Sequence, residues 1–248
     1  MKKPPVRNDT PSGAVDDRDL LTAQVAYYRA RAAEYDAWWF RTGRFDRGGA
    51  NNAAWHTDVA SVERAVTDML ATARPSRVLE LACGTGLFTR HLAPRVEHVT
   101  AVDAAPEVIA INRRRVGASN VDYVEADLFA WEPPRRYDCV FMSFWLSHVP
   151  PARFAPFWAM VRRALAPQGF AYVVDSAHDP TSTAANHPTP DRTAGIVLRK
   201  LDDGREFRIV KVFHEPEPLM ASLEALGFSA RIGRTRRYFI YGEVRAAG

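Results

Sequence analysis

The chain has 248 residues, of which 47% are hydrophobic and 25% are charged. This length and composition fit one full-sized globular domain, or a core domain with a small cap, rather than two independent folds. The formal net charge is +4, from basic residues that are mostly scattered, and this excess is too mild to indicate a nucleic-acid-binding protein.

The two cysteines, Cys83 and Cys139, have neither paired nor metal-ligand spacing, so we expect no disulfide framework and no metal site. No apolar run approaches the roughly 20 residues that a membrane-spanning helix needs. The first residues lead into polar sequence rather than the apolar core of a signal peptide. These features predict a soluble cytoplasmic protein with no membrane partner.

The N-terminal part is expected to contain a disordered leader, residues 1–18, which has almost nothing to bury. After it, aromatic and apolar residues recur at spacings of three and four, which predicts one helix face made of Val25, Tyr28, Ala32, Tyr35 and Trp39. Glycines at 43, 48 and 49 end this helix, a loop continues through Asn51 and Asn52, and a second amphipathic helix runs from Val59 to Leu70.

Short apolar strands then alternate with helical patterns, which is typical of a parallel sheet covered by helices on both faces. The strands are expected at about 77–82, 98–103, 121–125, 137–143 and 170–175, each a continuous apolar run. A helix begun by Pro150 and Pro151 lies between the last two. We therefore expect an α/β fold with a doubly wound, mostly parallel sheet.

The C-terminal third is less regular. An insertion over about 177–205 begins as a loop, and such loops often cover a site. The apolar runs 195–198 and 207–213 flank Asp202, Asp203 and Gly204, which predicts a hairpin. A last helix closed by Gly227 and one final strand over 229–245 complete the pattern.

The most informative run is Val78 to Gly86, in which an apolar strand carries Glu80 and passes into the turn Gly84-Thr85-Gly86. It resembles the first motif of the class I S-adenosylmethionine (SAM)-dependent methyltransferases, where a carboxylate-tipped strand precedes a small-x-Gly-x-Gly turn. The resemblance implies a Rossmann-like sheet of seven strands over residues 58–248, with residues 19–57 as a helical lid. It also implies a transferase that uses SAM and releases S-adenosylhomocysteine (SAH).

Three acids follow successive predicted strands, where a doubly wound sheet binds its ligands. Asp103 ends the second strand, and its carboxylate can accept hydrogen bonds from both ribose hydroxyls. Asp127 matches the position that meets adenine in the family, and Glu80 the acid that acts near the amino-acid part of SAM. The implied cofactor-binding residues are Tyr28, Glu80, Ala82, Gly84, Gly86, Asp103, Ala104, Asp127, Leu128 and Ser143.

Each of these signals has a simpler interpretation when taken alone. Glycine turns follow strands in many α/β proteins, and Asp103 could serve as a helix N-cap. NAD is disfavoured because its fingerprint needs a third glycine three residues after the second, where this chain has Thr89. ATP is disfavoured because no Gly-Lys-Ser/Thr phosphate loop is present. The three acids together favour SAM.

The acceptor side is less specific. After the fourth strand the chain reads Ser143-Phe144-Trp145-Leu146, whereas enzymes that methylate base amino groups commonly carry a polar-Pro-Pro-aromatic sequence there, so nucleic acid is disfavoured as a partner. His148 is the candidate catalytic residue because an unperturbed imidazole titrates near pH 6.5, although it could instead only cap or pack.

An aromatic-rich pocket favours a small-molecule substrate over a polymer. Its expected walls are the aromatic segment of the lid, Trp145, and residues His178, His187 and Phe213 of the insertion and the chain just after it. The acceptor is either aromatic or, with Arg31, Arg41 and Arg199 in these segments, carboxylate-bearing.

These patterns predict a SAM-dependent methyltransferase of the bacterial small-molecule type, with secondary metabolism as one setting and a monomer or homodimer as the assembly. Two alternatives remain at this point: a SAM-pocket protein that catalyses a non-methylating reaction such as a cyclisation, and a non-catalytic SAM-binding regulator. The sequence leaves the acceptor atom open among O, N, C and S.

Overall fold

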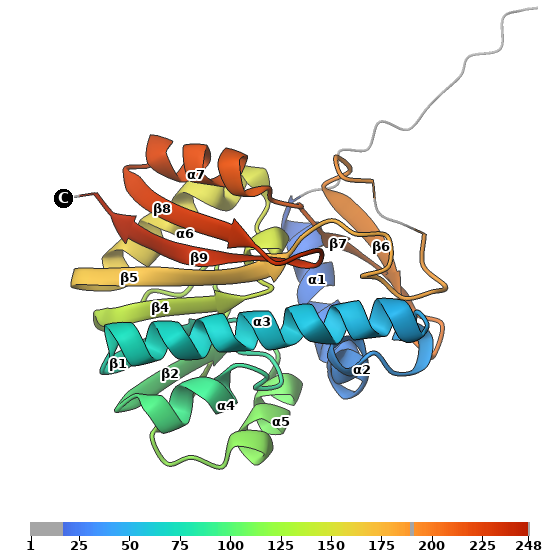
Figure 1. Ribbon diagram of the computed structural model, residues 1–248, viewed down its shortest axis with the longest axis horizontal. Helices are drawn as coiled ribbons and strands as arrows, with labels where there is room; N and C mark the ends of the chain where they lie inside the picture. Colours follow the sequence, from blue (N-terminus) through green and yellow to red (C-terminus); the bar gives the residue numbers. More distant parts are fainter. Residues whose placement is uncertain (1–16, 189–190, 248) are drawn as a thin grey trace, which may run out of the picture.

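The protein is described here by a computed structural model that covers residues 17–188 and 191–247. At its centre is a seven-stranded sheet with strand order β3-β2-β1-β4-β5-β9-β8 (Figure 1). Its strands are β1 (Arg77–Leu81), β2 (His98–Asp103), β3 (Val121–Glu125), β4 (Tyr137–Ser143), β5 (Leu165–Ser176), β8 (Phe228–Arg234) and β9 (Phe239–Ala246). Strands β1 to β5 pair in parallel, and β9 runs antiparallel to both β5 and β8. The doubly wound, mostly parallel fold is confirmed.

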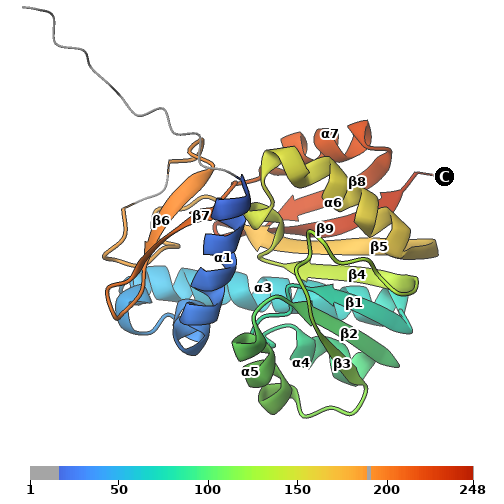
Figure 2. The same ribbon diagram turned by 180° about the vertical axis from the view of Figure 1, so that it is seen from behind.

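Helices cover both faces of this sheet, as the continuous apolar strands require. Helices α3 (Gly49–Ala73) and α4 (Thr89–Leu92) pack on one face, around Val62, Phe141 and Val174. Helices α6 (Pro151–Ala164) and α7 (Pro216–Ala225) pack on the opposite face, around Leu81 and Met142 (Figure 2). Helix α5 (Pro106–Val116) connects β2 to β3.

The aromatic N-terminal segment is not one continuous helix, so that expectation was wrong. Helix α1 (Asp17–Arg31) is followed by the short 3-10 turn η1 (Ala32–Glu34) and by α2 (Tyr35–Phe40). The break lets Ala32 pack against Ala105 and Val108 while Trp39 enters the main core. The turn η2 (Gly43–Phe45) follows, and Asn51 and Asn52 lie inside α3 rather than in a loop.

The C-terminal strands also differ from the expectation. The segment predicted as one strand forms two, β8 and β9, and these supply the antiparallel end of the sheet. The turn between them is fixed by the buried Asp58 of α3, whose Oδ2 accepts the hydroxyl of Thr235 at 2.7 Å and the amides of Arg237 and Tyr238 at 2.8 Å.

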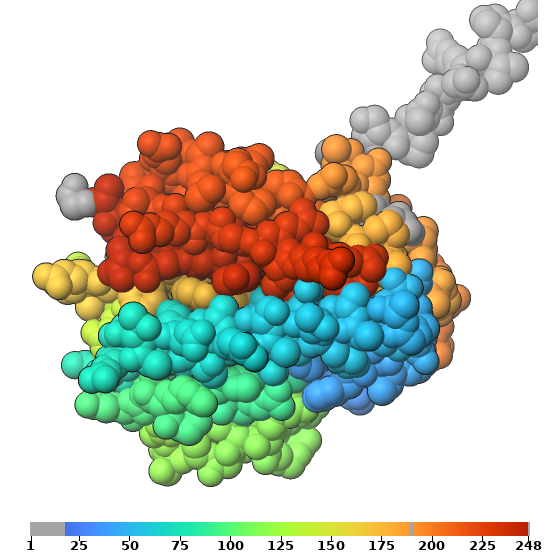
Figure 3. Space-filling model, viewed as in Figure 1, coloured from blue at the N-terminus to red at the C-terminus, as the bar shows by residue number. Residues whose placement is uncertain are grey.

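The predicted hairpin is present as β6 (Ile196–Lys200) and β7 (Glu206–Val210), but it forms a separate two-stranded sheet. This hairpin, α1 and α2 gather beyond the carboxyl ends of β4 and β5 (Figures 1 and 2). In the space-filling view the blue N-terminal segment and the orange insertion meet at the surface over this end (Figure 3).

The proposed lid boundary at residue 57 falls within α3, and the predicted leader lies outside the described residues as far as residue 16. Two further short 3-10 turns are η3 (Ala93–Arg95), which follows α4, and η4 (Leu146–His148), which follows β4. Within the described part of the chain, no helix is both long and apolar enough to cross a membrane.

Candidate active site

A large pocket of about 790 Å³ opens at the carboxyl ends of β1 to β4, where the strand order reverses between β1 and β4. We call it the switch-point pocket. Its floor comes from the strand ends and its cover from α1. Its wall includes Tyr28, Ala82, Gly84, Asp103, Ala104, Asp127, Leu128, Ser143 and His148, all of which the sequence had singled out.

The turn after β1 has a backbone that few side chains tolerate. Ala82, Gly84 and Gly86 all have positive φ angles, of 53°, 52° and 86°. A Cβ atom on Gly86 would lie 2.6 Å from Oδ1 of Asn112, so this glycine is needed for packing. Gly86 therefore shapes the loop although it does not line the switch-point pocket.

Asp103 joins this loop to the end of β2. Its Oδ2 accepts the amide of Gly84 at 2.9 Å, and its Oδ1 accepts the amide of Ala105 at 3.0 Å. Burial raises the pKa of Asp103 to about 6, although the backbone hydrogen bonds oppose this shift. Each carboxylate oxygen keeps a further lone pair for a ligand.

Glu80 is buried and also does not line the switch-point pocket. The hydroxyl of Thr89 donates to its Oε2 at 2.7 Å, while Oε1 has no partner among the described residues. Burial raises the pKa of Glu80 to about 8. The side chain is therefore mostly a neutral carboxylic acid at pH 7.

Two networks that hold the glycine loop escaped the sequence analysis. Asn112 donates through Nδ2 to Thr89 Oγ1 at 2.8 Å and to the carbonyl of Cys83 at 3.2 Å. From the lid, Asp36 accepts the hydroxyl of Thr85 at 2.6 Å and pairs with Arg115. No local pattern marks these residues, because their partners are distant in the sequence.

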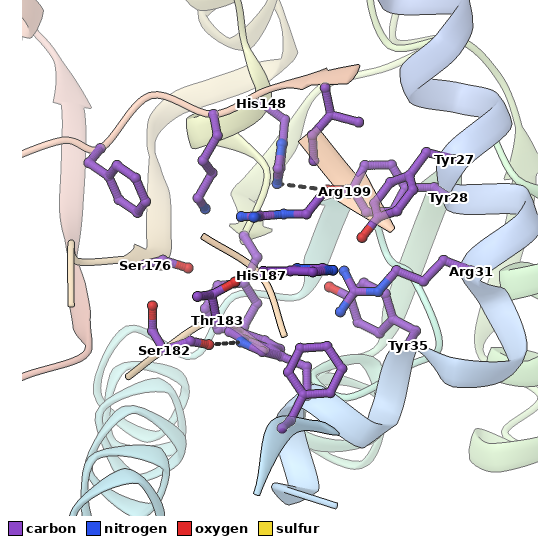
Figure 4. Close-up of a pocket in the computed structure, with 16 residues that line it drawn as sticks. Tyr27, Tyr28, Arg31, Tyr35, His148, Ser176, Ser182, Thr183, His187 and Arg199 are labelled. Atoms are coloured by element: carbon purple, nitrogen blue, oxygen red, sulfur yellow. Dashed lines mark hydrogen bonds between the residues drawn. The ribbon is translucent and has the colours of Figure 1, made fainter. Parts of the chain in front are cut away.

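A second, smaller pocket of about 70 Å³ adjoins the first (Figure 4). We call it the cationic pocket. The lid, the insertion and the ends of β4 and β5 all contribute to its wall. Four residues line both pockets and therefore mark their junction: Tyr28, Tyr35, Phe144 and His148. Phe144 has a φ of 54°, a left-handed conformation that is uncommon for a bulky residue and often found at functional sites.

The cationic pocket carries an excess of positive charge. Arg31 and Arg199 point into the same cavity (Figure 4), and neither guanidinium makes a side-chain hydrogen bond or a salt bridge with a described residue. The guanidinium of Arg31 instead lies over the rings of Tyr27, Tyr35 and Phe45, and Glu34 acts on it only through a longer-range electrostatic interaction. Lys211 is buried beside them, with Nζ 2.8 Å from Ser147 Oγ and 3.8 Å from Asp175 Oδ1. Among the described residues that line this pocket, none is Asp or Glu.

This charge excess alters several pKa values. Burial lowers the pKa of Lys211 to about 8, and the nearby Arg199 and Arg31 add to the shift. Burial, with Arg199 second, lowers the pKa of His187 to about 4. Burial also lowers the pKa of Arg199. Such surroundings favour an anionic ligand, because unpaired buried charges are costly.

His148 lies at the junction, as expected for a residue close to the chemistry. Its Nε2 is 2.7 Å from the hydroxyl oxygen of Tyr28, and its Nδ1 is 2.7 Å from the carbonyl oxygen of Val210. Burial lowers the pKa of His148 well below 6.5, and Lys211 adds to this effect.

The other residues expected on the acceptor side lie in different places. Phe213 and His187 line the cationic pocket, and His178 packs edge-on against Phe213 at 4.9 Å between ring centroids. Arg41 does not reach it; its guanidinium bonds the carbonyls of Thr181 and Ser182 instead. Trp145 lines the switch-point pocket.

The sequence and the fold have counterparts among known proteins. Residues 78–169 match a family model described as a methyltransferase domain. The demethylmenaquinone methyltransferase of Thermus thermophilus is 30% identical over 191 residues, which cover 68% of this chain and 81% of that protein. Nodulation protein S of Rhizobium tropici is 28% identical, over 53% of this chain and 56% of its own length.

Solved structures extend the similarity over nearly the whole chain. The complex of DhpI with SAH is 39% identical, with a TM-score of 0.75, and the match covers 93% of this chain and 98% of that one. A complex of DhpI with SAM and HEP matches with a TM-score of 0.74. The switch-point pocket fits such a cofactor in its volume, its glycine loop and the carboxylate of Asp103. The chain belongs to the class I SAM-dependent methyltransferases, with SAM as its methyl donor.

Proposed function

We propose that this enzyme methylates a small anionic metabolite that binds in the cationic pocket. The observation that carries the proposal is the pair of arginines, Arg31 and Arg199, which face one cavity without an acidic partner among the described residues. An acceptor with a carboxylate, phosphonate or phosphate group would supply the missing negative charge. This favours the acid over a purely aromatic acceptor.

In this proposal the switch-point pocket holds SAM. Asp103 accepts the ribose hydroxyls, Gly84 and Ala82 allow the amino-acid part to approach the backbone, and Asp127 with Leu128 lies at the adenine. Glu80 and Gly86 act through the loop, since neither lines the pocket. Bound SAM supplies an electrophilic methyl group on a sulfonium.

The acceptor reaches that methyl group at the junction of the two pockets. Tyr28, Tyr35 and Phe144 separate the anion site from the donor site and exclude water. The cations then hold the acceptor in a fixed orientation, and alignment of this kind can supply on the order of 7–11 kcal/mol of the barrier reduction. The similarity to DhpI, which has been described with SAM and a second ligand together, supports a two-ligand site.

The test is a screen with methyl-labelled SAM and the full chain. The panel pairs small carboxylates, phosphonates and phosphate monoesters with neutral amide or ester analogues of the same shape. We expect labelled product and SAH from at least one acid and none from its neutral analogue. Equal labelling of the neutral analogues would contradict the proposal.

A variant pair sharpens the same test. Arg199→Gln should raise the acceptor KM about ten- to hundredfold, because a charge-assisted hydrogen bond is lost. The dissociation constant of SAH should stay within twofold. Arg205→Gln is the matched control, since Arg205 lies exposed in the same hairpin, where its guanidinium contacts Asp203 and the face of Phe207.

A further inference from the structure

The hydrogen bonds of His148 determine which of its ring nitrogens carries a proton. A carbonyl oxygen can only accept, so the contact of 2.7 Å with Val210 requires a hydrogen on Nδ1. In the neutral ring Nε2 is then the acceptor, and the hydroxyl of Tyr28 donates to it at 2.7 Å. The lone pair that a general base would use is therefore already taken by Tyr28.

The groups around His148 oppose the uptake of a second proton. Arg31 approaches from the end of α1, Arg199 from β6 and Lys211 from the segment after β7. Asp175, near the end of β5, is an acid that faces Lys211, and it accepts the amides of Ser147 and Ser176. An imidazolium at this position would add a further positive charge to an enclosed cluster of cations.

No other side chain at the junction can take a proton from the acceptor. Of the four residues that line both pockets, Phe144 has no basic group, and burial raises the pKa of Tyr35 to about 12, so its hydroxyl remains protonated. His187 and Lys211, with pKa values lowered to about 4 and about 8, line the cationic pocket alone, away from the donor side.

We infer that the acceptor atom arrives already ionised, and that the Tyr28–His148 pair positions it without acting as a general base. This inference rests on the proposed function. The ionised oxygen of the acceptor forms the new bond to the methyl carbon while the carbon–sulfur bond breaks and its electron pair stays on sulfur. The positive sulfonium and one negative charge of the acceptor disappear together, and no proton is released.

His148 is thus a positioning residue for Tyr28. His148 accepts a hydrogen bond from the hydroxyl of Tyr28, so the hydroxyl hydrogen points toward His148 and not toward the acceptor. The hydroxyl therefore does not donate a hydrogen bond to the attacking oxygen, whose lone pairs stay available for the methyl group. The lid also holds the backbone of His148 in place, since the side-chain amide of Gln24 donates through Nε2 to the carbonyl of His148 at 3.2 Å.

The first test counts protons in a weakly buffered reaction at pH 8, with the best acid from the screen and an indicator dye. We expect no proton per SAH formed beyond those that the free acid itself still carries at that pH. One additional proton per SAH would overturn the inference while leaving the proposed function intact. If no acid yields SAH, the proposed function fails and this inference fails with it.

The second test is spectroscopic and needs no turnover. In the SAH-bound protein labelled with ¹⁵N-histidine, His148 should show a protonated Nδ1 and an unprotonated Nε2 between pH 6 and 8. The spectrum of the His148→Gln variant identifies its signal. Protonation of both nitrogens within this range would overturn the inference.

Two substitutions separate positioning from proton transfer. His148→Gln can keep an acceptor oxygen for Tyr28 but cannot act as a base, and we expect kcat to fall less than tenfold. His148→Asn keeps a donor for Val210 but is too short to reach Tyr28, so it should resemble Tyr28→Phe, with a raised acceptor KM. A loss of about 10²- to 10⁴-fold in kcat for both His148 variants would indicate a general base.

Discussion

Asp103 both stabilises the backbone around the switch-point pocket and lines that pocket. Asp103 holds the glycine loop through Gly84 and the start of α5 through Ala105, and it also faces the switch-point pocket. The simpler interpretation of Asp103 as a helix N-cap was wrong, because the N-cap of α5 is Ala105 and no side chain caps this helix. Asp103 instead accepts the amide of Ala105, and this structural role does not exclude ligand binding. A substitution here acts on both functions.

At this scale we predict that Asp103→Ala weakens SAM and SAH binding at least a hundredfold. The variant loses the acceptor for two ribose hydroxyls, each a charge-assisted bond of about 1.5–3 kcal/mol, and frees the amide of Gly84. The SAM and SAH affinities of Asp103→Asn should lie between those of the wild type and of Asp103→Ala, because the amide keeps an acceptor oxygen. Isothermal calorimetry measures the affinities, with Asp122→Ala, an exposed carboxylate of β3, as control. Unchanged SAH affinity in Asp103→Ala would refute the assignment.

At the scale of elements, the sequence predicts the strands well and the lid poorly. Strands β1 to β4 match their predicted bounds closely. Strands β1, β2 and β4 are mostly apolar because they are buried inside the sheet, whereas β3 lies at its edge and is partly exposed. The lid breaks at Ala32–Glu34 even though its three-and-four spacing continues. Helix α1 packs on β7 and α5, whereas α2 packs on the main core, and one straight helix could not reach both.

The same limit applies to the site. Glu80, Asp103 and Asp127 could be found because each follows a strand at a fixed place in the fold. The sequence analysis named Arg31, Arg41 and Arg199 for an acidic acceptor, but it could not tell which of them share a cavity, because Arg31 ends α1 while Arg199 lies in the β6–β7 hairpin. Only the packing of these two elements against each other, through Tyr27 and Ile209, places both side chains at one cavity.

Gln24 is the residue that joins these elements, and it is only 3% exposed. Its Oε1 accepts the amide of Val210 at 3.0 Å, and its Nε2 donates to the carbonyl of His148. We predict that Gln24→Ala, which leaves both backbone groups unpaired at about 1–3 kcal/mol each, loosens the lid. The acceptor KM should rise, and hydrogen exchange in α1 and β7 should become faster.

The control for this prediction is Asp19→Ala, at an exposed position of the same helix. Exchange in β1 and β4 should stay as slow as in the wild type, because these central strands are almost completely buried and pair on both sides with other strands of the sheet. If α1 in Gln24→Ala exchanged at the wild-type rate, the lid would be held by other contacts.

At the scale of the whole molecule, the proposed function makes each of the two ligands depend on a titrating group in one of two adjoining pockets. In the proposed function, SAM in the switch-point pocket needs an ionised Asp103, and the anionic acceptor in the cationic pocket needs a charged Lys211. The pKa of Asp103 is raised to about 6, so its charge is lost as the pH falls through that value. The pKa of Lys211 is lowered to about 8, so its charge is lost as the pH rises through that value.

We therefore predict a window of activity between about pH 6 and pH 8. The ratio kcat/KM for SAM should fall on the acid side and kcat/KM for the acceptor on the alkaline side, since these ratios report the enzyme before the varied ligand binds. Asp103→Asn should remove the acid limb, because the amide does not titrate. Lys211→Arg should move the alkaline limb upward, because a guanidinium keeps its charge. An alkaline limb that stays in place in Lys211→Arg would assign it to a different group, and the charge of Lys211 would then not be what retains the acceptor.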